Sequence, residues 1–229
     1  GTFFYAMVYL DGLSLEEIVA RDGPMPASRV VHLLLQACGA LHEAHQRGLV
    51  HRDVKPQNLM ACRLGGQVDF LKVLDFGLVK DLGNDHSRDL TQYARMLGTP
   101  LYMAPERIRN PADVDARADI YALGAVAFFL LTGRRVFEGV GDHALVNQVL
   151  HEAPVAPSAA GARDVPALLD ALVLHCLAKD RERRPATILD VAAVLQEVAR
   201  ARPWQEDMAA AWWASHRPAA EPLPQAASG

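Results

Sequence analysis

Eight consecutive residues, HRDVKPQN at positions 51–58, constrain the fold of this chain more than any other stretch. They include an aspartate, a lysine and an asparagine at Asp53, Lys55 and Asn58. Neither the period of a helix nor the alternation of a strand requires that combination. A chemical role explains such a run better than regular secondary structure does, and the rest of the sequence indicates which chemistry.

The composition predicts one sizeable soluble domain. Of the 229 residues, 51% are hydrophobic and 22% are charged, which is typical of a globular protein and not of a disordered one. The formal net charge is −4, so no overall electrostatic attraction to nucleic acid or to an anionic membrane is expected.

No segment predicts a membrane span or a signal peptide. The start of the chain lacks a basic region followed by an apolar one. The most apolar run, at 120–131, is shorter than the roughly 20 residues of a bilayer span, so we expect a buried helix there. The odd number of scattered cysteines indicates reduced thiols and a cytoplasmic location. Because the sequence begins with Gly1 and not Met, it looks like a protein entered partway through.

Local patterns predict strands and helices within the first 77 residues. Residues 2–10 are aromatic and β-branched, which favours a strand ending at a turn. Ser14 and Glu17 fit a capping box for a helix that closes at Gly23. A long amphipathic helix is expected over residues 28–47. The runs LVHRD (49–53) and FLKVLDFG (70–77) flank GGQ and predict small β-hairpins.

Helical patterns dominate the second half of the chain. They cover residues 115–131, 142–151, 166–178 and 187–200, whereas 78–103 has no sustained period and predicts a long loop. Trp204, Trp212 and Trp213 fall in the Ala- and Pro-rich tail. Their spacing suits one helix that lays an aromatic stripe on the lobe, and a partner-binding stripe is the alternative.

At HRDVKPQN the sequence resembles the catalytic loop of protein kinases, in which Asn follows the H-R-D motif after four residues. Four further landmarks of that family follow in order: DFG at 75–77, APE at 104–106, Asp119 in ADIYALG, and Arg184 in DRERRPA. DFG alone is a weak signal, but five ordered motifs over most of the chain are a strong one.

The resemblance implies an α+β protein-kinase fold, represented by the hinge and a mainly helical C-terminal lobe with small β-hairpins. Residues 1–13 would be the last strand of the N-terminal lobe and the hinge. Residues 14–200 would be the C-terminal lobe, with the catalytic loop at 51–58 and the activation segment at 75–106. Residues 201–229 would form a Trp-bearing helix and an Ala/Pro-rich tail.

The implied activity is transfer of the γ-phosphoryl group of Mg·ATP to serine or threonine hydroxyls of protein substrates. Asp53 would accept the proton of the incoming hydroxyl, and Lys55 would place a cation beside the transferring group. Asn58 and Asp75 offer the oxygen ligands that suit Mg²⁺. Lys55 together with GTP at 98–100 resembles serine/threonine kinases more than tyrosine kinases.

By the same resemblance, ATP would contact the hinge. Met7 would be the gatekeeper, the backbones of Val8 and Leu10 would face adenine, and Met60 would form the floor of the pocket.

The resemblance also assigns regulatory and structural roles. Arg52 would pair with a phosphate on the activation segment, whose candidate acceptors are Ser87, Thr91 and Tyr93, with Thr91 favoured. Thr99 would hydrogen-bond the catalytic loop. Glu106 and Arg184 would form a buried ion pair.

Several suggestive residues have a plainer interpretation. His51 is expected to be a packed structural histidine. His42 and His45 are three residues apart, whereas the zinc-protease helix that they resemble needs histidines four apart, so we expect no metal site there. Cys62 lacks a basic or helix-start setting that would make it reactive.

The glycine-rich loop, the strand lysine and the helix glutamate of a kinase would all precede the hinge, and no G-x-G-x-x-G occurs in the sequence. We therefore expect these residues alone to bind ATP poorly and to transfer phosphoryl groups slowly or not at all. Two functions stay open: the catalytic lobe of an active serine/threonine kinase, or a non-catalytic lobe that binds partners. The presence of Asp53, Lys55, Asn58 and Asp75 favours the enzyme. The protein substrate and the oligomeric state are not predicted.

Overall fold

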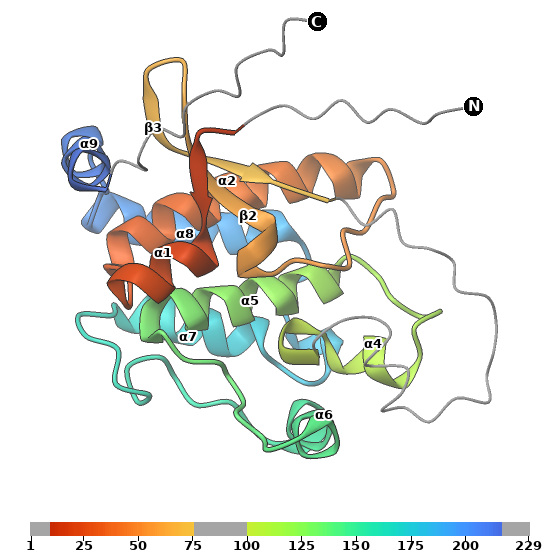
Figure 1. Ribbon diagram of the computed structural model, residues 1–229. Coiled ribbons are helices and arrows are strands. Elements are labelled where there is room, and N and C mark those ends of the chain that lie inside the picture. The colour runs from red at the N-terminus through yellow and green to blue at the C-terminus, as the bar shows by residue number, and fades with distance from the viewer. Residues whose placement is uncertain (1–9, 76–99, 217–229) are drawn as a thin grey trace, which may run out of the picture.

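The computed structural model describes residues 10–75 and 100–216, which form a helical lobe with a small sheet at one edge (Figure 1). The strand predicted at 2–10 therefore falls almost entirely outside the described residues. The helices are α1 (Leu15–Asp22), α2 (Ala27–Gln46), α4 (Pro105–Arg109), α5 (Arg117–Thr132), α6 (Asp142–His151), α7 (Ala167–Cys176), α8 (Ile188–Ala201) and α9 (Glu206–Ser215). The strands are β1 (Gly12–Ser14), β2 (Leu59–Leu64) and β3 (Gln67–Val73).

Helices α1 and α2 form where the sequence predicts them. The backbone N–H of Glu17 donates to Ser14 Oγ at 3.2 Å, and the Glu17 carboxylate accepts from the Ser14 N–H at 2.7 Å, so the capping box is confirmed. Gly23 ends α1 with φ of +79°, a conformation that glycine adopts without steric cost. Helix α2 differs from its predicted bounds by a single residue at each end.

The sheet differs from the prediction in one respect. Strands β1, β2 and β3 pair antiparallel in that order, and Leu59 lies opposite Val73. The predicted strand LVHRD is wrong: residues 49–55 are irregular, and Leu59–Leu64 pairs with β3 instead. Arg52 has φ of +65°, a left-handed conformation outside the range of regular strands, and its N–H donates to a side chain and not to a neighbouring strand.

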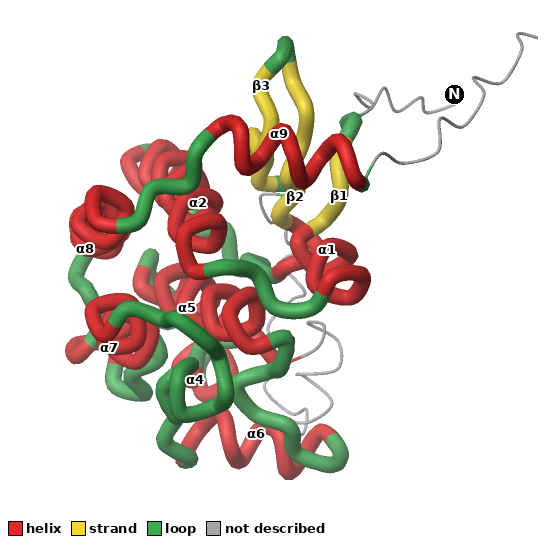
Figure 2. Tube along the Cα trace, turned by 90° about the vertical axis from the view of Figure 1, so that its left-hand side faces the viewer, coloured by secondary structure: helices red, strands yellow, loops and turns green. Residues whose placement is uncertain are grey.

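Helix α5 is the centre of the lobe. It is buried on almost every face, as its continuous apolar sequence predicts, and it lies against α2, α7 and α8 (Figure 2). The predicted helices at 142–151, 166–178 and 187–200 are confirmed as α6, α7 and α8. Among the described residues, no helix is long and apolar enough to cross a bilayer.

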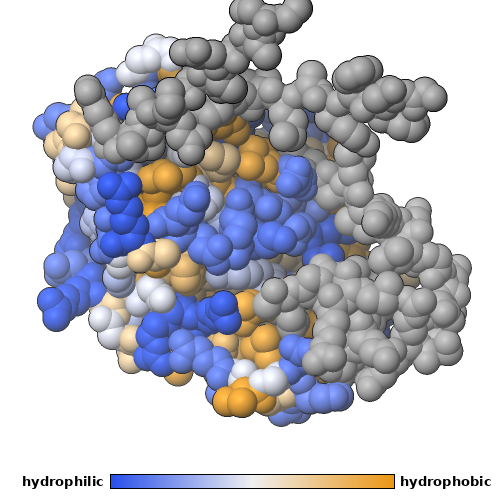
Figure 3. All heavy atoms as spheres, in the orientation of Figure 1, coloured by the Kyte–Doolittle hydropathy of each residue, from blue (hydrophilic) through white to orange (hydrophobic). Residues whose placement is uncertain are grey.

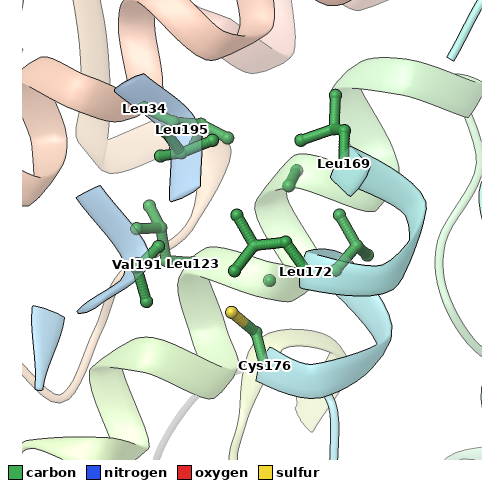
Figure 4. A pocket seen from close by; sticks show the side chains of 10 residues that line it. Leu34, Leu123, Leu169, Leu172, Cys176, Val191 and Leu195 are labelled. Atoms are coloured by element: carbon green, nitrogen blue, oxygen red, sulfur yellow. The ribbon is translucent and has the colours of Figure 1, made fainter. Parts of the chain in front are cut away.

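The core between α2, α5, α7 and α8 contains one very small apolar cavity. Figure 4 shows the leucines of these helices and Cys176 pointing toward it. Its volume of about 10 Å³ is no larger than a single water molecule requires, and its lining is almost purely hydrocarbon. It is therefore a packing defect and not a ligand site.

The tryptophan prediction is partly wrong. Trp212 and Trp213 belong to α9, but Trp204 precedes that helix, so the three do not share one helical stripe. They nevertheless lie on the lobe, because Trp213 is buried and both Trp204 and Trp212 are half-buried. The described part of the tail thus agrees with the core interpretation rather than with an exposed stripe.

Candidate active site

The loop 51–58 is held in place by one buried carboxylate from the central helix. Asp119, in the first turn of α5, is 1% exposed. Its two oxygens accept the backbone N–H groups of His51 and Arg52, each at 2.8 Å. Hydrogen bonds to an ionised acceptor are among the strongest in proteins. This pair of bonds stabilises the left-handed backbone of Arg52 and fixes the start of the loop.

Two further side chains brace the same segment. His45 Nε2 lies 2.8 Å from Asp119, which connects α2 to the anchor. Arg107, from α4, donates from Nη1 to the carbonyl oxygen of Arg52. The loop is therefore tied to α2, α4 and α5 at once.

Asp53, Lys55 and Asn58 lie together on the loop 51–58. The Lys55 ammonium lies 2.7 Å from Asp53 Oδ2, and Asn58 Nδ2 donates to the same oxygen at 2.9 Å. Asn58 Nδ2 also donates to the Asp53 carbonyl at 2.9 Å. The side chains of Asp53 and Lys55 are about one-third exposed, at 35% and 33%, so a substrate can reach them. Asn58 itself is buried at 8% exposure, which makes it a rigid support.

His51 is a structural residue, as predicted. It is 0% exposed. Its Nδ1 accepts the Asp53 N–H at 3.2 Å, and its Nε2 lies 3.0 Å from the carbonyl of Leu74. An imidazole protonated on Nε2 satisfies both partners. His51 thus links the loop to the residue that immediately precedes Asp75.

Asp75 follows β3 after a single residue and is exposed, with φ of +51°. The N–H of Leu74 donates to the Asn58 carbonyl at 2.8 Å, so the two predicted metal ligands stand at the two feet of the β2–β3 hairpin. Because Asn58 directs its amide nitrogen to Asp53, its amide oxygen is the atom that a cation would use.

Some of the remaining predicted site residues lie outside the described residues. These are Met7, Val8, Ser87, Thr91, Tyr93 and Thr99. Leu10 and Met60 are half-buried. On the face shown in Figure 3, apolar side chains gather over β1 and β2, above a hydrophilic band.

The predicted Glu106–Arg184 pair is present. Both carboxylate oxygens of Glu106 lie 2.7 Å from the guanidinium, whose side chain is 0% exposed. The cysteines are all buried, and burial raises the thiol pKa of Cys62, in agreement with the expectation that it is unreactive. Among the described residues, no group of three or more His, Cys, Asp or Glu side chains could hold a metal.

The contact of His45 and the bonds of Asp119 were not predicted from the sequence. A usable signal existed for Asp119: a carboxylate inside a helix whose interior is almost entirely apolar must have buried partners.

The fold and the loop geometry define the catalytic lobe of a protein kinase. Residues 2–198 match the protein kinase domain family, so the chain belongs to that family.

Two bacterial serine/threonine kinases are similar to the chain in sequence. The chain is 40% identical over 195 residues to serine/threonine-protein kinase PknB of Mycolicibacterium smegmatis. The aligned region covers 85% of this chain and 30% of that protein. The chain is 38% identical over 205 residues to pkn3 of Myxococcus xanthus, covering 88% and 37%. The chain therefore spans about a third of the length of these curated relatives.

Solved kinase structures share the fold. The PknI kinase domain of Mycobacterium tuberculosis, as a C20A mutant, matches with a TM-score of 0.60 and 28% identity, over 83% of this chain and 63% of that one. Rad53 1–466 in complex with AMP-PNP matches with a TM-score of 0.61 and 25% identity, over 80% and 44%.

Proposed function

We propose that this is the catalytic lobe of an enzyme that transfers the γ-phosphoryl group of Mg·ATP to serine or threonine hydroxyls of protein substrates. One observation carries the proposal: an accessible carboxylate, Asp53, is fixed between Lys55 and Asn58 on a loop anchored to the central helix. Phosphoryl transfer needs positioning and charge neutralisation more than covalent chemistry, and this arrangement supplies both.

Each residue would have a distinct task. Asp53 would orient the substrate hydroxyl and accept its proton during attack on the γ-phosphorus. Lys55, already paired with Asp53, would shift part of its charge interaction to the transferring phosphoryl group. The hard oxygen atoms of Asn58 and Asp75 fit Mg²⁺, which would neutralise charge on the phosphates when bound.

The adenine of ATP would lie against the hinge. We propose contacts with the backbones of Val8 and Leu10, with Met7 as gatekeeper and Met60 as the floor. The apolar surface over β1 and β2 supports this placement (Figure 3). Because ATP is the phosphoryl donor, we place the lobe in the cytoplasm.

Arg52 has an exposed side chain. It would form an ion pair with a phosphate group carried by the activation segment, preferably on Thr91.

The test is phosphoryl transfer from labelled ATP by the native full-length protein, with phosphoamino acid analysis of the product. Asp53→Asn is expected to lower kcat by roughly 10²–10⁴-fold because it removes the proton acceptor. Asp75→Ala is expected to abolish transfer. Glu43→Gln, an equivalent loss of a carboxylate at an exposed site on α2, is the control and is expected to have no effect.

Near-normal rates in Asp53→Asn or Asp75→Ala would contradict the role assignment. An inactive wild-type protein would favour the other function, a partner-binding lobe. The kinase names of the relatives and the intact Asp53–Lys55–Asn58 group support the enzyme.

A further inference from the structure

The C-terminal segment 203–216 lies outside the part of the chain that matches the kinase family, which ends at residue 198. It nevertheless contacts the lobe through its tryptophans. Helix α9 lies across the outer side of the β2–β3 hairpin (Figure 2). A segment that is not part of the family's common domain and yet packs on its sheet needs an explanation of its own.

The contact is built on one buried carboxylate. Asp69, in β3, is 0% exposed and pairs with Arg29 of α2 through two bonds of 2.8 and 2.7 Å. The indole N–H of Trp213 donates to Asp69 Oδ1 at 2.7 Å, and that of Trp204 donates to Oδ2 at 3.0 Å. Four N–H groups from two distant segments thus converge on one carboxylate. We call Arg29, Asp69, Trp204 and Trp213 the indole clasp.

The aromatic rings add to the same contact. The ring of Trp212 lies 3.8 Å from the guanidinium carbon of Arg29, a cation–π distance. A cavity of about 370 Å³ separates the start of α9 from parts of α2 and β3. The segment is thus attached both by the bonds to Asp69 and by the burial of the Trp213 ring in the hydrophobic core.

The β2–β3 hairpin has a β-bulge at Asp69, the carboxylate of the indole clasp. Asp69 has φ of +54°, and the register shifts between Cys62 and Leu64, where β3 has one residue more than β2. Such a bulge turns a side chain away from its regular direction. The Gln36 amide donates to the Asp69 carbonyl at 2.8 Å and so holds the bulge against α2.

Asp69, the carboxylate of the indole clasp, and the predicted metal ligands lie on or beside the same β2–β3 hairpin. Asn58 immediately precedes β2, and Asp75 follows β3 after Leu74, so both stand at the open end of the hairpin. Asp69 lies toward the closed end, near the Gly65–Gly66 turn. Because both ends of the hairpin are held by contacts with other elements, the hairpin cannot tilt as a unit. The distance between Asn58 and Asp75 is therefore maintained.

We propose that segment 203–216 positions Asn58 and Asp75 by fixing the far end of the hairpin that carries them. Trp213, Trp204 and Asp69 are then positioning residues for the metal site. The metal role of Asn58 and Asp75 rests on the proposed function, whereas the mechanical coupling from the indole clasp to the hairpin feet does not.

The experiment uses Trp213→Phe, which keeps an aromatic ring but removes one N–H donor to Asp69. Amide exchange by NMR reports on the feet directly, because the Leu74 N–H is bonded to the Asn58 carbonyl. We expect roughly 10-fold faster exchange at Leu74. The Leu177 amide, at the end of α7, serves as a remote reference and is expected to stay unchanged.

The second readout is the Mg²⁺ concentration that gives half-maximal phosphoryl transfer in the native protein. We expect Trp213→Phe to raise it about 3- to 10-fold, with kcat largely restored at saturating Mg²⁺, since the effect acts through ligand geometry. A general loss of stability would lower kcat at all Mg²⁺ concentrations. Trp212→Phe is the matched control, because its indole makes none of the bonds to Asp69.

Faster exchange confined to 203–216, with Leu74 and the Mg²⁺ requirement unchanged, would overturn the proposal. If Trp213→Phe does not fold, Trp204→Phe removes the other indole bond from a half-buried position and tests the same coupling. If the wild-type protein transfers no phosphoryl group, the proposed function fails, and exchange at Leu74 still decides whether the indole clasp controls the hairpin.

Discussion

Removing the carboxylate of Glu106 is expected to destabilise the lobe severely. Arg184 is completely buried, and all five of its N–H donors are used. Two of the five bonds go to Glu106, and the others go to the carbonyls of Ala178, Arg117 and Lys179. Glu106→Ala leaves a buried cation without its counter-charge, because the three carbonyls cannot neutralise it.

The magnitude follows from the lost bonds. Each buried donor without an acceptor costs about 1–3 kcal/mol, and more when it is charged, so two donors cost roughly 2–6 kcal/mol. Breaking a buried ion pair from one side typically costs about 3–5 kcal/mol, in the same range. For a domain of this size, that corresponds to a fall in Tm of roughly 6–20 °C.

The assay is thermal and urea denaturation of the chain followed by circular dichroism. Glu182→Ala is the control: Glu182 pairs with Arg117 at 2.7 Å, but it is 68% exposed, and solvent-exposed pairs contribute little to stability. The double variant Glu106→Ala, Arg184→Met is expected to recover part of the loss, since it removes the buried charge. If Glu106→Ala costs no more than Glu182→Ala, the reasoning from burial is refuted.

Two further changes test the electrostatics and the packing. Burial lowers the pKa of Lys179 to about 8, and its ammonium donates to the carbonyls of Gln148 and Val149. Between pH 8 and 10.5 the unfolded lysine keeps a proton that the folded one releases. The stability of the wild-type protein relative to Lys179→Met should therefore rise with pH in denaturation series across that window. A stability difference that does not change with pH would contradict the lowered pKa. Gly124→Ala would bring a methyl group within 2.6 Å of Cys176 Cβ and should cost about 1–3 kcal/mol in a urea titration. Gly39→Ala, with open space around it, should be neutral or stabilising, and equal effects at the two sites would argue against the close approach of α5 and α7.

Much of this fold could be predicted from the sequence because its signals are local. The capping box at Ser14, the glycine that ends α1 and the apolar run of α5 each act within a few residues. The motif spacing predicted the Asp53–Lys55–Asn58 group for a related reason, since those residues share one short loop.

The features that were missed depend on contacts between distant residues. LVHRD has the composition of a strand, but the bonds from Asp119, 67 and 68 residues away, hold the segment in a loop. Asp69 looks like a polar interruption in a strand, and its indole partners lie 135 and 144 residues further on. The hydrophobic periodicity of the sequence does not reveal such pairs, because each pair depends on tertiary packing and not on neighbouring residues in the sequence.

The β2–β3 hairpin brings together in space two residues that are distant in the sequence. Asn58 and Asp75 are far apart in sequence, yet the bond from Leu74 to the Asn58 carbonyl makes their backbones neighbours. Residues added at the Gly65–Gly66 turn would lengthen the chain between Asn58 and Asp75, the two predicted metal ligands, without moving either one. The interval between the two motifs is therefore free to vary, and a search for similar lobes should require their order but not a fixed spacing.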